Sequence, residues 1–376
     1  MERFDAIVIG LGGMGSAALF HLARRGVKVC GIEQFEINHT LGSSHGEVRA
    51  IRKAYFEHPD YVPLLHRAYE LWDELQLTTE QSIFERCGMV FAGQQSSPAV
   101  DGLNRCFNEH HLPHDELSAD EANSRYPKFN FSEDDTVFYD PDAGYVVPET
   151  TVERHVQLAR DAGAKIKTET EVKSWREVDD GIEVTTESST LTAKKLIVCA
   201  GAWTDQILAK LGLPLEIRRK VQLWYSTPNV DSYSRDFPIW FMDRPYGGVY
   251  GFPSLDGKTI KAAVHSGEDV TQSPETLKRE LVEGDQDLVL RCLRDTFPGI
   301  IPTLDRFSVC MYTCTPDEHF IIDQHPEHEN VFFGAGFSGH GFKFVPVVGE
   351  ILADLTIQGR SDLPYEFLRL GRFHGI

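Results

Sequence analysis

Two cysteines, Cys310 and Cys314, lie four residues apart in the stretch SVCMYTCTPDEHFIID, among a tyrosine, a histidine and three acids. A CxxxC pair can form half of a zinc site, but the histidines that follow lack the spacing of a second half. A disulfide would need an oxidising compartment and a special geometry. Two buried thiols that act as small apolar side chains are the simplest interpretation. A thiol that reacts with a bound cofactor is the fourth alternative, and it depends on what else the chain binds.

Two further groups of residues carry charges that could bind an anion or assist a reaction. Arg49 and Arg52 are three residues apart in an acidic chain, and a guanidinium fork suits both oxygens of a carboxylate. Lys261 and His265 are four residues apart in KTIKAAVH, where the alternation of a strand would place them on one face. The ordinary alternatives are surface salt bridges for the arginines, a solvated strand lysine for Lys261 and a satisfied core histidine for His265.

A glycine motif near the N-terminus has the context of a nucleotide-binding turn. The sequence GLGGMG follows a β-branched run, precedes a helical segment, and is succeeded by a second apolar run that closes on Glu33. Gly10 permits a tight turn, Gly12 lets the backbone approach a pyrophosphate, and Gly15 lets the helix pack on the strand. Glu33 would accept a ribose hydroxyl. The motif therefore predicts a dinucleotide-binding site but does not distinguish NAD from FAD. The alternative interpretation is a glycine-rich turn in some other α/β protein.

The composition limits the classes of protein to which the chain can belong. With 376 residues it is long for one core, which favours two domains. The net charge of −20 would repel nucleic acid. The seven cysteines are scattered along the chain, which indicates a reducing compartment. No run reaches the roughly 18 apolar residues of a membrane span, and the N-terminus lacks the pattern of a signal peptide. We therefore expect a cytoplasmic protein with no nucleic acid or membrane partner.

Alternating helical and extended segments must position these residues. In chain order the pattern predicts a strand over 4–10, a helix over 16–26, a strand over 27–33, a helix over 147–163, a strand over 165–172, a hairpin over 181–193, a strand that enters a small-residue turn over 195–203, a strand and glycine-rich turn over 330–344, and a helix over 346–355. The nucleotide domain is therefore expected from three separated pieces, 1–80, 150–214 and 320–376. The intervening pieces, 81–149 and 215–319, contain short alternating segments that predict a mainly antiparallel sheet over the cofactor.

Several stretches together resemble one family of flavoenzymes. They are IGLGGMGSAA, SHGEVRAIRKAY, YVPLLHRAYELWDEL, IVCAGAW, YGFPS, CMYTCTPDEHFIID and GFSGHGFKF, and they cover nearly the whole chain in order. The chain resembles the monomeric sarcosine oxidase, N-methyltryptophan oxidase and pipecolate oxidase family, within the glycine/D-amino-acid oxidase group. The resemblance implies an α/β fold (α+β overall): a glutathione-reductase-like FAD-binding Rossmann domain with a mainly antiparallel-sheet substrate domain. It also implies a monomer.

The resemblance assigns FAD-binding roles to residues spread along the chain. The cysteine of the CMYT stretch, Cys310, would carry FAD covalently as an 8α-S-cysteinyl thioether, whereas Cys314 would be structural. Val172, Gly339 and Gly341 would line the cofactor. The helix after Gly341 would direct its positive N-terminus at the flavin ring.

The same resemblance assigns the substrate side. Arg52 and Lys343 would hold a substrate carboxylate, and Tyr250 and His265 would line the pocket. Lys261 would sit above the flavin and activate oxygen as a fixed cation.

Three more residues would complete the site. His45 and Arg49 would bias the protonation state of the amine. Tyr312 shares a face of an extended segment with Cys310 and could face the site, with a core aromatic as the alternative. One departure from the family pattern is Ser44, which stands where a histidine is frequent.

The expected activity is that of an FAD-dependent oxidase of a secondary α-amino acid, such as sarcosine or another N-methyl or cyclic amino acid. Oxidation of the C–N bond would give an imine, and oxygen would be reduced to hydrogen peroxide. A flavin dehydrogenase with another electron acceptor and a non-catalytic flavin-binding protein are the alternatives. No metal is expected.

Overall fold

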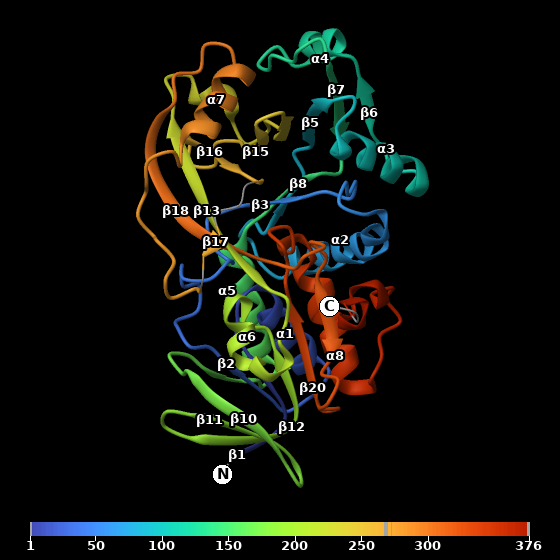
Figure 1. Cartoon of the computed structure of the whole chain (residues 1–376), viewed down its shortest axis with the longest axis vertical. Helices are drawn as coiled ribbons and strands as arrows, with labels where there is room; N and C mark the ends of the chain where they lie inside the picture. Colours follow the sequence, from blue (N-terminus) through green and yellow to red (C-terminus); the bar gives the residue numbers. More distant parts are fainter. Residues whose placement is uncertain (1, 267–269, 272, 374–376) are drawn as a thin grey trace.

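The computed structural model describes residues 2–266, 270–271 and 273–373. Its strands form three sheets, which we call A, B and C, with eight, three and nine strands. Sheet A lies in the lower half of Figure 1 and sheet C in the upper half, with the short sheet B between them. The predicted α/β fold, a Rossmann-like unit combined with a mainly antiparallel sheet, is confirmed.

Sheet A contains the predicted nucleotide-binding strands. Its members are β1 (Glu2–Ile9), β2 (Val29–Ile32), β9 (Lys165–Lys167), β10 (Val172–Val178), β11 (Gly181–Thr186), β12 (Thr190–Val198), β19 (Ile321–Gln324) and β20 (Val331–Ala335). The parallel strands β9, β2, β1, β12 and β20 are neighbours in that order, while β10, β11 and β19 are added as antiparallel strands. Ile9 is level with both Ile32 and Val198. The carboxyl ends of three parallel strands therefore meet at one edge, where α/β sheets bind their ligands.

Helices cover sheet A because its parallel strands are apolar on both faces. The helices of this part are α1 (Gly13–Arg24), α2 (Val62–Gln76), α5 (Pro148–Asp161), α6 (Thr204–Ile207) and α8 (Val345–Gln358). Helix α1 packs between α5 and α8, so it is buried almost all round. A Cβ on Gly349 of α8 would lie 2.5 Å from the Cβ of Ala17, so this glycine sets how closely α8 approaches α1.

Sheet C is antiparallel except for the pair β5–β14. Its strands are β5 (Met89–Gln94), β6 (Asp115–Leu117), β7 (Asp135–Asp140), β13 (Glu216–Ser226), β14 (Ile239–Arg244), β15 (Gly247–Phe252), β16 (Thr259–Val264), β17 (Val270–Thr271) and β18 (Thr303–Cys314). Strands β13 and β18 of this sheet pair from end to end and extend from the upper part of the molecule toward its middle (Figure 1). This long ribbon brings the CMYT stretch to the edge of sheet A.

Sheet B and three outer helices complete the described fold. Sheet B consists of β3 (Arg49–Ile51), β8 (Gly144–Val146) and β4 (Phe84–Glu85), with β8 in the centre. The outer helices are α3 (Pro98–His110), α4 (Ala119–Arg125) and α7 (Asp287–Thr296). These helices lie within the pieces 81–149 and 215–319, whose strands mostly belong to the mainly antiparallel sheet C. Helix α3 has a clear signal, a Ser97 cap followed by Pro98 in the first turn.

The predicted single strand over 165–172 is also wrong. The structure has two strands, β9 and β10, separated by residues 168–171. Glu169 adopts a positive φ of 49°, and its amide donates to the carbonyl of Phe35. The Thr170 amide donates to the carbonyl of Glu33. The chain turns here because its backbone bonds to the loop after β2 instead of continuing the β9 ladder.

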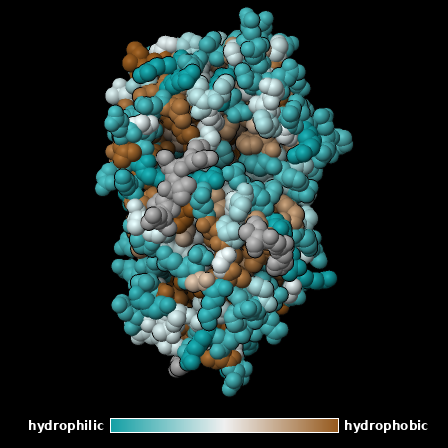
Figure 2. Space-filling view, in the orientation of Figure 1, coloured by the Kyte–Doolittle hydropathy of each residue, from teal (hydrophilic) through white to brown (hydrophobic). Residues whose placement is uncertain are grey.

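The face of the molecule in Figure 2 is mostly hydrophilic, with small separate hydrophobic areas. This matches an acidic chain whose large apolar side chains are mostly buried in its core. Within the described ranges, no helix has the length and apolar character needed to cross a membrane.

Candidate active site

A groove runs along the carboxyl edge of sheet A. Its walls come from the glycine turn after β1, the end of β2, the start of β10, the turn after β12, strand β18 and the turn before α8. The wall therefore includes predicted cofactor residues from widely separated parts of the chain: Gly10, Gly12, Glu33, Val172, Cys310, Gly339 and Gly341.

The three glycines of the turn have different surroundings. Gly10 has a φ of +85°, and a Cβ there would lie 2.5 Å from the Cys199 carbonyl oxygen. A Cβ on Gly15 would lie 1.8 Å from the Gly10 carbonyl oxygen, so this glycine permits helix and strand to touch. A Cβ on Gly12 would meet only Ser44 Oγ, at 3.4 Å, and would otherwise project into open space. The backbone at Gly12 therefore has open space beside it on the wall of the groove, which leaves room for a pyrophosphate to approach.

Glu33 closes the turn from the side. Its Oε2 accepts from the Leu11 amide at 2.8 Å and its Oε1 from the Phe35 amide at 3.1 Å. The carboxylate is 5% exposed and keeps free lone pairs on the groove wall. It can therefore hold the glycine turn in place and still accept ribose hydroxyls. The residues of this groove fit a dinucleotide such as FAD.

Cys310 and Cys314 are both buried free thiols on β18, but only Cys310 lines the groove. Arg49 Nη2 lies 3.8 Å from Cys310 Sγ and also donates to the Ser43 carbonyl at 3.2 Å. The described residues contain no cluster of three or more His, Cys, Asp or Glu side chains that could hold a metal ion. The structure therefore separates the two cysteines by position: Cys310 lines the groove, and Cys314 is buried outside it.

A smaller pocket adjoins the groove, and the two share Arg49, Tyr312, Gly339 and Phe342 as lining residues. The wall of the pocket is largely aromatic but also contains charged groups. Besides the shared residues, its lining includes Arg52, Phe56, Glu57, Trp240, Phe241, Tyr250, Phe252, His265, His340 and Lys343. The predicted substrate residues Arg52, Lys343, Tyr250 and His265 are thus brought together.

Arg52 is 6% exposed and is bound by the protein itself. Its Nη2 donates to both carboxylate oxygens of Glu57 at 2.8 Å, and its guanidinium lies 4.7 and 4.1 Å from the ring centres of Tyr55 and Phe56. Burial alone would raise the pKa of Glu57, but Arg52 lowers it to about 2. Sequence reasoning missed Glu57, for which the only signal is an acid five residues after Arg52.

Lys343 supplies the second cation of the pocket. Its Nζ donates to the His340 carbonyl at 2.8 Å and lies 5.2 Å from the Tyr55 ring centre. Burial and the charge of Arg52 lower the pKa of Lys343 to about 7. With Arg52 and Lys343 charged and one carboxylate, Glu57, the pocket has a net positive charge and can accept an anion.

An uncharged wall faces these cations. The His265 ring lies 5.8, 6.3 and 5.9 Å from the rings of Phe241, Tyr250 and Tyr312. Burial lowers the pKa of His265 to about 4, so it is neutral at pH 7. The hydroxyls of Tyr250 and Tyr312 bond to each other, and burial raises the pKa of both.

The two glycines of the last turn make room for rings of the protein. A Cβ on Gly339 would lie 2.2 Å from the Tyr312 ring, and one on Gly341 would lie 2.5 Å from Phe337. Close approach of a cofactor to these glycines stays a prediction, but both line the groove. The N-terminal residue of α8, Val345, lines it as well.

Two predicted catalytic residues lie next to Arg49 but line neither cavity. Lys261 is 2% exposed, and its Nζ donates to the carbonyls of Gly46 and Val48 at 2.6 and 3.0 Å. His45 is 1% exposed, and its Nδ1 lies 3.3 Å from Ser308 Oγ. Burial and the neighbouring Arg49 lower the pKa of His45 to about 3. Arg49 links them, since it donates to the carbonyls of His45 and Val48.

Comparisons with known proteins agree with this geometry. Residues 5–355 match the family described as FAD dependent oxidoreductase. The chain is 43% identical to a monomeric sarcosine oxidase of Streptomyces avermitilis, covering 96% of this chain and 95% of that protein. It is 35% identical to an N-methyl-L-tryptophan oxidase of Escherichia coli, covering 99% and 100%. A solved structure of NikD, an amino acid oxidase of nikkomycin biosynthesis, has a similar fold, with a TM-score of 0.87, 23% identity, and coverage of 98% and 97%. The chain therefore belongs to the FAD-dependent oxidoreductase family, among the relatives of the monomeric sarcosine oxidases.

Proposed function

We propose that the protein oxidises a secondary α-amino acid, such as sarcosine or another N-methyl or cyclic amino acid, and passes the electrons through FAD to oxygen. One observation carries the proposal: the pocket that shares a wall with the FAD groove places two buried cations opposite a neutral, aromatic wall. The named activities of the curated relatives support the same substrate class.

The pocket residues determine how such a substrate would bind. Its carboxylate would lie between Arg52 and Lys343, because a charge-assisted bond to either cation replaces water lost on entry. Its amine would face His265 and Tyr250, where low polarity disfavours an ammonium ion. The substrate would then be held with its reacting carbon toward the groove. Bound FAD supplies the two-electron acceptor for the C–H bond next to nitrogen.

The experiment that tests this function is anaerobic mixing of the yellow holoenzyme with candidate amines. Sarcosine or a related secondary amino acid should bleach the flavin, and air should restore the colour with release of hydrogen peroxide. Bleaching by primary amino acids alone would change the substrate class. No bleaching by any amine would favour a non-catalytic flavin protein and overturn the proposal.

Covalent attachment of FAD through Cys310 is part of the proposal. It is supported by the position of Cys310 on the wall of the groove and by the Arg49 guanidinium, whose Nη2 lies 3.8 Å from the Cys310 sulfur. After denaturation, flavin fluorescence should stay on the protein band, disappear in Cys310→Ser and survive in Cys314→Ser. Free FAD in the supernatant of the native sequence would contradict the tether and leave the fold assignment intact.

The proposal that oxygen is the electron acceptor depends on Lys261, a buried lysine that lines neither cavity but donates to the backbone beside Arg49. A fixed cation stabilises negative charge that develops on oxygen. Lys261→Met should slow reoxidation by oxygen and leave anaerobic reduction largely unchanged. Equal loss in both half-reactions would contradict this role, and fast reoxidation only by a quinone or a protein acceptor would identify a dehydrogenase. We also propose a monomer, for which sedimentation at one chain mass is the test.

A further inference from the structure

The loop before β3 contains a tight turn of an unusual kind. The Val48 amide donates to the Gly46 carbonyl at 2.8 Å, two residues back, and the residue between them, Glu47, has a φ of +68°. This is a γ-turn with a positive φ at its centre, a form that is rare and strained for a residue other than glycine. Such strain persists only where the surroundings impose it.

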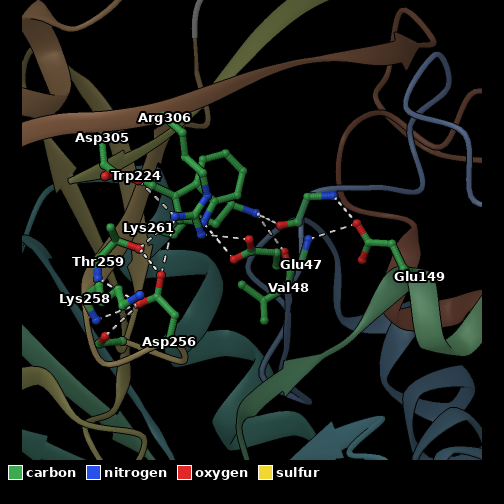
Figure 3. A network of polar contacts seen from close by, with 12 residues as sticks. Glu47, Val48, Glu149, Trp224, Asp256, Lys258, Thr259, Lys261, Asp305 and Arg306 are labelled. Atoms are coloured by element: carbon green, nitrogen blue, oxygen red, sulfur yellow. Dashed lines mark hydrogen bonds and ion pairs between the residues drawn. The ribbon is translucent and has the colours of Figure 1, made fainter. Parts of the chain in front are cut away.

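Two carboxylates impose this turn from opposite sides (Figure 3). Glu149 Oε1, in the first turn of α5, accepts from the amides of Gly46 and Glu47 at 2.6 and 3.1 Å. The Glu47 carboxylate itself points to sheet C, where Oε2 accepts from Trp224 Nε1 at 2.9 Å and Oε1 from Arg306 Nη2 at 2.8 Å. Strands β13 and β18 therefore hold the side chain of the turn, and α5 holds its backbone.

The turn has a consequence for Lys261. It directs the carbonyl oxygens of Gly46 and Val48 to one ammonium group, at 2.6 and 3.0 Å from Lys261 Nζ. The same ammonium lies 5.2 Å from the ring centre of Trp224, whose indole N–H is the group that Glu47 binds. One carboxylate thus orients both the carbonyl pair and the aromatic face that surround Lys261.

The two carboxylates act on the charge of Lys261 in the same direction as the geometry. Burial lowers the pKa of Lys261 well below its ordinary value, Arg49 lowers it further, and the negative charges of Glu149 and Glu47 oppose the change. A buried ammonium needs such partners to remain charged.

We propose that Glu47 is a positioning residue for Lys261: its carboxylate, held by Trp224 and Arg306, fixes the strained turn whose carbonyl oxygens keep the ammonium in place. The link to oxygen chemistry rests on the proposed function, but the hold on Lys261 does not. Arg306 and Glu47 are 38% and 46% exposed, so their ion pair alone contributes little. The bond to the Trp224 indole is the stronger part of the clamp.

Substitutions at Glu47 distinguish two roles for this residue: positioning Lys261, or simply allowing the chain to reverse direction. Glu47→Gly removes the clamp and also the strain, because glycine accepts a positive φ. Glu47→Ala removes the clamp and keeps the strain, whereas Glu47→Asp keeps a carboxylate. If the turn only reversed the chain, Glu47→Gly would be harmless.

The primary test measures the chemical reactivity of Lys261, which does not depend on turnover. Brief acetylation with acetic anhydride, digestion and mass spectrometry give the modification of Lys261 relative to the exposed Lys258, three residues earlier. We expect the ratio to rise about tenfold in both Glu47→Gly and Glu47→Ala as local opening increases, and to return toward the native value in Glu47→Asp. Glu183→Gln, which removes the charge of a Glu–Arg pair between β11 and β10 with an N–O distance of 2.8 Å, is the matched control and should leave the ratio unchanged.

An unchanged ratio in folded Glu47→Gly and Glu47→Ala would overturn the proposal. If those variants do not fold, Trp224→Phe removes the indole donor, keeps an aromatic but smaller ring beside Lys261, and should raise the ratio by a smaller factor; no rise there would equally overturn the proposal.

Half-reaction kinetics give the second readout. Glu47→Gly should slow reoxidation but not anaerobic reduction, and should add nothing in a Lys261→Met background, since residues that act through one another are not additive. An equal slowing in that background would contradict action through Lys261. If Lys261→Met reoxidises normally, the proposed oxygen role fails, while the acetylation ratio still decides the role of Glu47.

Discussion

The groove and the pocket share a wall but are built in different ways. The groove is built at its glycine turn from backbone and from three glycines that leave no side chain in the way. One acid, Glu33, closes this turn and is itself bonded to backbone amides. The pocket presents buried side chains of both charges, from segments between Arg49 and Lys343. Binding at the glycine turn therefore depends on shape along a short stretch of chain, although the rest of the groove wall comes from distant segments. Binding in the pocket depends on electrostatic balance among residues that only the fold brings together.

The largest expected effect tests the steric half of this comparison. Gly10 and Gly26 have nearly the same φ, +85° and +79°, but a Cβ on Gly10 would lie 2.5 Å from the Cys199 carbonyl oxygen, while one on Gly26 would meet nothing within 4 Å. Gly26→Ala should cost about 1–2 kcal/mol of unfolding free energy from backbone strain alone and keep its flavin. Gly10→Ala should cost more than about 4 kcal/mol or leave no FAD-loaded protein. Thermal unfolding and the flavin-to-protein absorbance ratio measure both.

Similar losses in the two variants would show that backbone strain, not the closeness of the Cys199 carbonyl, makes the turn sensitive.

The second prediction tests the electrostatic half. Arg52→Ala removes one of the two cations proposed to bind the substrate carboxylate and leaves the largely buried Glu57 carboxylate without its partner. Breaking such a pair should cost about 3–5 kcal/mol of unfolding free energy, and KM for the amino acid should rise about 10²–10³-fold. In Arg52→Ala/Glu57→Gln the carboxylate charge is gone, so stability should recover while KM stays high. Urea unfolding and steady-state kinetics on the same preparations separate the two effects; recovery of both would mean that Arg52 only neutralises Glu57.

The third prediction uses the pKa of Lys343, which is lowered to about 7. Below pH 7 the ammonium is charged and attracts a carboxylate, and above pH 7 it is neutral. Across pH 6–9 the charges of Glu57 and His265 stay constant, because their pKa values lie near 2 and 4. The Kd of acetate, a carboxylate without an amine, should therefore rise by up to about tenfold per pH unit above 7. Perturbation of the flavin spectrum measures this Kd.

Lys343→Met is the control, and it should give an acetate Kd that is weak and nearly flat with pH. The effect on stability has the opposite sign to that on binding. The unfolded lysine keeps its ordinary pKa of 10.5 and binds more protons than the folded one between pH 7 and 10.5, so the unfolding free energy should rise with pH in that window. A pH slope that persists in Lys343→Met would assign the titration to another group.

The local part of the site could be predicted because its signals are close together in sequence. Gly10, Gly12, Gly15 and Glu33 lie within one strand–turn–helix–strand unit, and the structure gives each glycine a separate steric reason. Helices α1, α5 and α8 occur within a few residues of the predicted ranges. The proposed division into two domains and the proposed roles of the site residues stay predictions.

The rest could not be predicted because it depends on partners chosen by the fold. Nothing in the sequence distinguishes Glu57 from an ordinary surface acid, and only its ion pair with the buried Arg52 identifies it as part of the pocket. Lys261 was placed on one strand face with His265, yet its ammonium is bound by carbonyls more than 200 residues earlier in the chain. The break between β9 and β10 likewise arises from backbone bonds to the loop after β2. The periodicity of apolar residues in the sequence indicates which face of a helix or strand is buried. It does not indicate which distant group a side chain will bind.

The smallest expected effect concerns the neutral wall of the pocket. Phe241 on β14 stacks on Phe91 with a ring distance of 5.4 Å and an interplanar angle of 5°, and it also faces His265. Gly248 lies behind it, where a Cβ would be 2.7 Å from Phe241 Cζ. The ring is thus fixed by three neighbours and limits the room beside His265. We expect it to restrict the size of the substituent on the substrate nitrogen or carbon.

Phe241→Leu should widen that space at a modest cost in stability. The kcat/KM ratio of a bulky N-methyl amino acid to sarcosine should rise about tenfold, the usual scale for one or two added methylene groups in an apolar pocket. Phe91→Leu is the matched control, because Phe91 contacts the same ring but does not line the pocket. It should lose similar stability with little change in the ratio. An equal shift in both variants would mean that looser packing, and not the volume at Phe241, sets the selectivity, and the pocket would then depend on its apolar support as much as on its charges.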